Sequence, residues 1–79
     1  MTPTTSLEKV DRKLRRFRAI ESSYRKTIKR AQEELRNETV DKERAQKRYN
    51  KVKAKYNRKI EKLQPKIRSL MHKRAELKG

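Results

Sequence analysis

Cysteine is absent from this sequence of 79 residues, and glycine, proline and aromatic residues are scarce. Without cysteine there can be no disulfide framework, no thiolate zinc site and no cysteine nucleophile. The one glycine is the last residue and there are only two prolines, so little in the chain interrupts a helix. Strand-forming residues are few and do not alternate with polar ones. We therefore expect an all-α protein.

Acidic residues and long apolar runs are also in short supply. The chain has 10 Asp and Glu against 26 Lys and Arg, which gives a formal charge of +16, and only 30% of its residues are hydrophobic. That is too little apolar surface for a compact globular core. No run approaches the ~20 apolar residues that a membrane span needs, and the N-terminal residues do not resemble a secretory signal. We expect a cytoplasmic protein, in a nucleoid, ribosome or virion particle, that is neither secreted nor bound to a membrane.

Groups that could carry catalysis are few. His72 is the only histidine, and no acid pair or glycine-rich loop accompanies it. Glu33 and Glu34 are adjacent in sequence, so on a helix they point in different directions. The sequence therefore predicts that the protein is not an enzyme and has no cofactor, no metal site and no small-molecule substrate.

The sequence does contain apolar residues at alternating intervals of three and four, the pattern of helices that pack on one another. Glu21 is a lapse in the first of two such seams, and the second seam is out of phase with the first. The first consists of Leu7, Val10, Leu14, Phe17, Tyr24, Ile28, Ala31 and Leu35, and the second of Tyr49, Tyr56, Ile60, Leu63, Ile67, Leu70 and Leu77. The change of phase predicts two helices.

A turn between these helices is predicted within residues 36–44, which include one apolar residue. Asn37 is suited to end a helix and Thr39 to begin one. The segment Thr5-Ser6-Leu7-Glu8 fits a capping box and starts the first helix near residue 6. We predict a short tail over 1–5 and a single helical hairpin domain over 6–79, with helices at 6–36 and 41–77, a turn at 37–40, and a kink or restart at Pro65.

Folding the chain back at this turn aligns the two seams. In that register Leu14 faces Leu63, and Glu21 lies beside Tyr56. The predicted fold is therefore an antiparallel, coiled-coil-like helical hairpin. The alternative is one long continuous helix in a coiled-coil dimer, with the phase change absorbed as a stutter. Both bury little apolar surface, so we expect self-association or a larger particle to support the fold.

Basic residues are concentrated in residues 44–60, which contain no acid and are called the acid-free segment below. On a helix we expect these cations to spread around most of the circumference, so that a single groove could not satisfy them all. A solvated helix face normally mixes both signs of charge, which this segment does not. Its candidate phosphate-binding residues are Arg44, Lys47, Arg48, Lys51, Lys53, Lys55, Arg58 and Lys59.

A second concentration, called the arginine cluster below, lies in residues 12–18. Arginine binds phosphate through two parallel hydrogen bonds and stacks on bases better than lysine does. Its candidate residues are Arg12, Lys13, Arg15, Arg16 and Arg18. The tyrosines of the seams, Tyr24, Tyr49 and Tyr56, either pack between the helices or stack on unpaired bases.

Asn50 and Arg58 have the Asn-x7-Arg spacing of the basic leucine zipper family, and leucines follow at seven-residue intervals. The comparison then fails, because Leu63 follows Arg58 too soon, Pro65 interrupts the zipper and the first helix has no counterpart. Sequence-specific DNA reading through Asn50 and Arg58 is thus a minor alternative.

These features together favour a non-sequence-specific nucleic-acid-binding structural protein that contacts phosphate backbones within a larger nucleoprotein particle. The particle would be ribosomal or ribosome-associated, or would package a nucleoid or virion. The partner is RNA or DNA, and the sequence does not distinguish them, because phosphate contacts carry no sugar or base information. The alternative is a coiled-coil assembly protein that binds an acidic protein partner.

Overall fold

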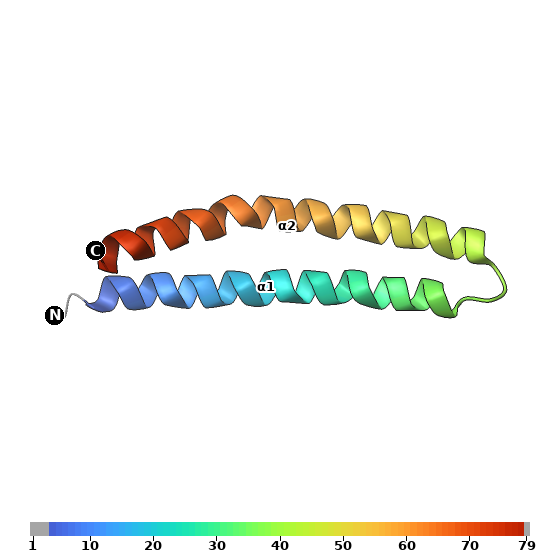
Figure 1. Cartoon of the computed structure of the whole chain (residues 1–79), viewed down its shortest axis with the longest axis horizontal. Helices are drawn as coiled ribbons and strands as arrows, with labels where there is room; N and C mark the ends of the chain where they lie inside the picture. Colours follow the sequence, from blue (N-terminus) through green and yellow to red (C-terminus); the bar gives the residue numbers. More distant parts are fainter. Residues whose placement is uncertain (1–3, 79) are drawn as a thin grey trace.

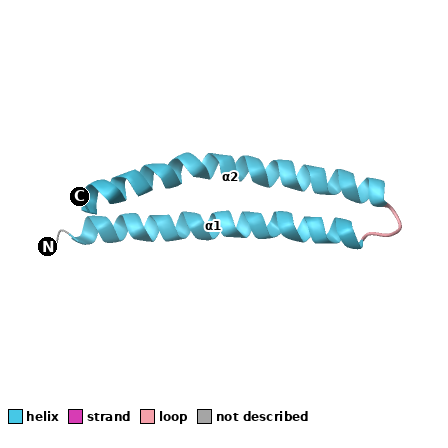
Figure 2. Ribbon diagram, in the orientation of Figure 1, coloured by secondary structure: helices cyan, strands magenta, loops and turns pink. Residues whose placement is uncertain are grey.

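The computed structural model describes residues 4–78, which form two long antiparallel helices (Figure 1). Helix α1 spans Thr4–Asn37 and helix α2 spans Lys42–Lys78. The hairpin measures 62 × 17 × 16 Å, and one short loop connects its helices (Figure 2). The predicted all-α hairpin is confirmed. The alternative of one continuous helix is wrong, because the chain reverses direction at residues 38–41.

The helix boundaries differ slightly from those predicted. Thr4 and Thr5 already belong to α1, so the helix begins before the predicted cap, whereas the rest of the predicted tail, residues 1–3, lies outside the described residues. The loop comes one residue later than expected, at 38–41 instead of 37–40.

Two acidic side chains organise the loop. The Oε1 atom of Glu38 accepts hydrogen bonds from the backbone nitrogens of Val40 at 3.1 Å and Asp41 at 3.4 Å, and these bonds hold the pKa of Glu38 below its ordinary value. The Oδ1 atom of Asp41 accepts a hydrogen bond from the backbone nitrogen of Arg44 at 3.0 Å. Asp41, rather than the predicted Thr39, therefore caps the N-terminus of α2.

The hydrophobic core is thin and lies toward the end of the hairpin that carries the termini, called the open end below. Among the described residues, the buried apolar side chains are Val10, Leu14, Ile60, Leu63 and Ile67. Phe17, Ile20, Tyr24 and Leu70 pack against this core and are half-buried. All of them except Ile20 belong to the predicted seams, so the pattern located the core correctly.

Ile20 was not expected in the core, and its position explains the lapse at Glu21. The interval from Phe17 to Ile20 is three residues and the interval from Ile20 to Tyr24 is four, so the apolar stripe continues around the carboxylate. Glu21 therefore lies at the edge of the interface instead of in its centre.

Pro65 lies within α2, which continues to Lys78 without a break, so the predicted restart is wrong. Figure 1 shows α2 arching over α1, with the top of the arch in its orange portion. Bending of this kind fits a proline in a helix interior, because proline removes a backbone donor and crowds the preceding turn. Pro65 is exposed, so the helix bends without disturbing the core.

The predicted register between the helices is wrong by one to two helical turns. Tyr56 packs against Tyr24 and not against Glu21, while Glu21 bonds Gln64, further along α2. Side chains on a helix lean toward its N-terminus. In an antiparallel pair the side chains of the two helices lean in opposite directions along the hairpin. Residues whose side chains touch are therefore offset from each other along the hairpin axis. The loop, which comes one residue later than predicted, increases this offset.

Candidate nucleic-acid interface

The cations of the acid-free segment lie on α2, from just after the loop to the middle of the helix. All of them are exposed except Lys59, which is half-buried. At about 100° per residue, all of them except Lys53 fall within an arc of about 120° on α2, so the expectation that they cover most of the circumference is wrong. The structure leaves these side chains available to a partner, and Lys51, Lys55, Arg58 and Lys59 line one shallow hollow together with Lys62.

Basic character continues along α2 beyond the acid-free segment. Between residues 44 and 75 the only acid is Glu61. Lys62, Lys66, Arg68 and Lys73 are all exposed in this continuation. The signal is present in the sequence, where Glu61 ends the acid-free segment. In the helix it is a single acidic side chain on an otherwise basic surface.

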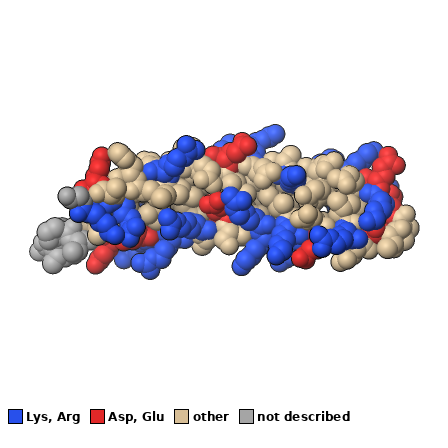
Figure 3. Space-filling view, in the orientation of Figure 1, with Lys and Arg blue, Asp and Glu red and all other residues tan. Residues whose placement is uncertain are grey.

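Ion pairs neutralise little of this charge. Among the described residues, Arg44 is the one candidate that forms an ion pair, with Asp41 at 3.8 Å. The other ion pairs join Arg25 to Glu21, His72 to Glu76 and Arg74 to Asp11. Figure 3 shows Lys and Arg along most of the visible face, with fewer acidic side chains, which lie at both ends and in the middle. Most of the positive charge is therefore uncompensated.

The arginine cluster lies at the open end, on α1, and its candidates are all exposed. They point in different directions. Lys13 and Arg16 share a groove with residues 65–70 of α2. Arg12 and Arg15 line a hollow together with Glu8 and Asp11, where the acids offset their charge. The cluster is thus divided, and it lies apart from the acid-free segment along the hairpin.

The tyrosines of the two seams are packed between the helices. The rings of Tyr24 and Tyr56 lie 5.5 Å apart with their planes inclined at 55°. The Nζ atom of Lys59 lies 5.5 Å from the Tyr24 ring centre and 4.9 Å from that of Tyr56. At such distances the ammonium group is attracted to the ring faces. Lys59 therefore contributes to packing as well as to charge.

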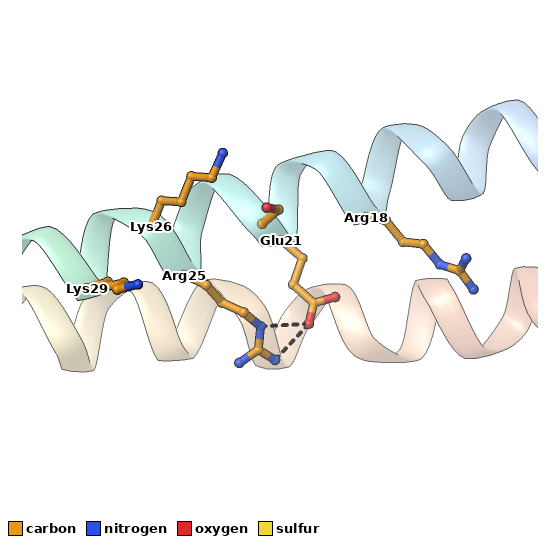
Figure 4. A pocket seen from close by; sticks show the side chains of 6 residues that line it. Arg18, Glu21, Arg25, Lys26 and Lys29 are labelled. Carbon is orange, nitrogen blue, oxygen red and sulfur yellow. Dashed lines mark hydrogen bonds and ion pairs between the residues drawn. The ribbon is translucent and has the colours of Figure 1, made fainter.

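Glu21 is held at the edge of the interface by partners on both helices. Its Oε1 atom accepts hydrogen bonds from Arg25 Nη2 at 2.8 Å and Nε at 3.2 Å (Figure 4). It also accepts one from Gln64 Nε2 at 3.0 Å. The hydrogen bonds from Arg25 are the main cause that lowers the pKa of Glu21, and the bond from Gln64 acts in the same direction. This acid therefore stabilises the hairpin.

Comparisons with known proteins place no family on this chain: no family model matches it, and neither a curated protein nor a solved structure does. Within residues 4–78, no group of three or more His, Asp or Glu side chains could hold a metal ion. Neither helix, over the same range, has a stretch apolar enough to cross a bilayer. The chemistry that the described surface offers most plainly is its positive charge.

Proposed function

We propose that the protein binds RNA or DNA without sequence specificity, through phosphate backbones, as a structural component of a larger nucleoprotein particle. The particle would be ribosomal or ribosome-associated, or would package a nucleoid or virion. In this proposal the acid-free segment and its continuation to residue 75 make the principal contacts.

The supporting observation is that α2 carries exposed cations from residue 44 to residue 75 with Glu61 as the only acid. A cation that contacts a phosphate releases a condensed counterion, which gives a favourable entropy of binding at low salt. Acidic side chains nearby would cancel this gain. In the described chain, Asp11, Glu21, Glu38 and Asp41 instead hold the hairpin together.

The directions of the cations favour several strands over one. A single duplex can contact only one side of the hairpin, whereas exposed cations lie on both α1 and α2. Phosphates from more than one strand, as in a ribonucleoprotein or a packaged genome, would satisfy them together. The hairpin would then act as a basic spacer between neighbouring strands.

The direct test is fluorescence anisotropy of the full chain with single- and double-stranded oligonucleotides of unrelated sequence. We expect similar affinities for different sequences, with a strong decrease as salt rises. Nucleic acid should also accompany the natively purified protein, and the absorbance ratio at 260 and 280 nm should fall after RNase or DNase. Lack of binding at low salt, combined with salt-sensitive capture of polyglutamate, would replace the proposal with an acidic protein partner.

A further inference from the structure

A groove crosses from one helix to the other at the open end, where the arginine cluster meets α2. Three cations line it: Lys13 and Arg16 from α1, and Lys66 from α2. Its apolar lining comes from Phe17, Pro65 and Leu70, and Ser69 adds a hydroxyl group. No acidic residue lines this groove. It therefore combines an apolar surface that includes an aromatic ring with a concentration of positive charge.

This combination distinguishes the groove from the other basic surface of α2. The hollow around Lys55, Arg58 and Lys62 is lined by cations and one small apolar residue, Ala54. It offers phosphate contacts alone. In the groove at the open end, the Phe17 ring is half-buried and the Nζ atom of Lys66 lies 6.0 Å from its centre. An aromatic ring beside cations is the arrangement that holds a stacked base and its phosphates.

Pro65 supports the same interpretation. A proline in a helix interior destabilises the helix by a large amount, and Pro65 is exposed, so it does not contribute to the core. Pro65 nevertheless lines the groove from α2, as Phe17 does from α1. Pro65 thus supplies an apolar surface to the groove at a position where helix stability would favour a residue other than proline.

We propose that this groove takes up one unpaired base of single-stranded RNA or DNA, with the adjoining phosphates on Lys13, Arg16 and Lys66. The groove has a volume of about 510 Å³, within the roughly 300–1,000 Å³ of small-molecule sites. A duplex cannot use it, because its bases are stacked inside the helix. The inference rests on the proposed function and adds that single strands are the preferred class.

The test compares a thymidine 15-mer with an abasic deoxyribose-phosphate strand of equal length and charge. The natural chain should bind the base-bearing strand about fivefold or more tightly, since stacking acts only on that strand. The variant Phe17→Leu keeps an apolar side chain against the core but removes the aromatic face. It should bind both strands with nearly equal affinity. The control variant Lys55→Gln should weaken both strands by the same factor.

A second experiment uses the unaltered chain, so that it does not depend on the folding of a variant. A strand with 5-iodouracil at one position is irradiated with the protein, and mass spectrometry locates the crosslink. Crosslinks at Phe17 or within residues 65–70 would support the groove. Crosslinks confined to other regions, or equal affinity of the natural chain for the two strands, would overturn the inference and leave phosphate binding intact. Failure to bind either strand would instead overturn the proposed function.

Discussion

The carboxylate of Glu21 on α1 accepts a hydrogen bond from the side-chain amide of Gln64 on α2, at 3.0 Å. The same oxygen accepts two hydrogen bonds from Arg25. One acid thus ties its own helix to the neighbouring one, at the point where the apolar seam of α1 is interrupted. The arrangement holds only while the carboxyl group is ionised, because a carboxylate accepts these bonds more strongly than the neutral acid.

We therefore expect the stability of the hairpin to depend on the protonation of Glu21. Folding lowers its pKa from the ordinary 4.5, so its contribution is complete above that value and is lost as pH falls through the lowered pKa. The variant Glu21→Gln should be less stable than the natural chain at pH 7 and equally stable at the acid end. Thermal unfolding followed by circular dichroism from pH 7 to pH 3 measures this, with Glu33→Gln as an exposed control. A constant difference across the range would contradict the assignment.

The fold could be predicted from the sequence, but the register could not, for a physical reason. Both seams repeat every seven residues, so sliding one helix by a heptad matches apolar residues to apolar residues again. Only the loop and the polar contacts at the edges distinguish such registers. Gln64 bonds Glu21, and Arg74 forms an ion pair with Asp11. Both contacts are made by long polar side chains, and a hydrophobic pattern does not predict which residues such side chains contact.

The polar contact at the open end provides a second test of the register. Arg74 and Asp11 form an ion pair with side chains that are 41% and 29% exposed, so solvent screens it and its coupling should be modest, about 0.5 kcal/mol. A double-mutant cycle with Asp11→Asn and Arg74→Gln, measured by urea unfolding, should detect this coupling. Coupling should be absent between Asp11 and Lys66, which would face each other in the register predicted from the two seams.

The position of the core predicts which apolar residues support the hairpin. Leu14 is only 4% exposed, whereas Leu77 is 44% exposed. Changing Leu14 to Ala should cost about 2 to 3 kcal/mol, or leave the chain unfolded without a ligand, because it removes a buried side chain from a thin core. The same change at Leu77 should cost less than about 1 kcal/mol. Helical circular dichroism during thermal unfolding compares them. Equal losses would place the core elsewhere.

The loop offers a test of helix capping. Asp41→Ala should destabilise the hairpin by about 0.5 to 2 kcal/mol, because the backbone nitrogen of Arg44 loses its acceptor at the start of α2. Asp41→Asn retains an oxygen at the same position and should cost much less. Denaturant unfolding of the two variants separates the cap from the charge. A similar loss in Thr39→Ala would instead favour the cap expected from the sequence.

The candidate interface was only partly visible in the sequence. Charge runs can be read directly, so the acid-free segment and the arginine cluster were identified. Their neutralisation and direction depend on the fold: Asp11 faces Arg74 across the hairpin, while Lys66 comes beside Lys13 and Arg16. These neighbours are far apart in sequence, and the register that brings them together was the feature the pattern could not supply.

The last prediction compares two sets of four cations with the same numbers of lysine and arginine. One set changes Lys47, Arg48, Lys51 and Arg58 of the acid-free segment to Gln, and the control changes Lys26, Lys29, Arg30 and Arg36 of α1. All are exposed, Gln preserves helix propensity, and both variants lose the same charge. Each cation on a single strand contributes about 0.7 to the slope of log affinity against log salt. The first set should lower the slope by about 2 to 3 units for unrelated sequences alike. The control set, whose neighbours include Glu33 and Glu34, should lower it by less than half as much.

Equal changes in the two variants would mean that net charge alone governs binding. An unchanged affinity would assign the function to the arginine cluster or to a protein partner, and a loss restricted to one sequence would indicate base reading through Asn50 and Arg58.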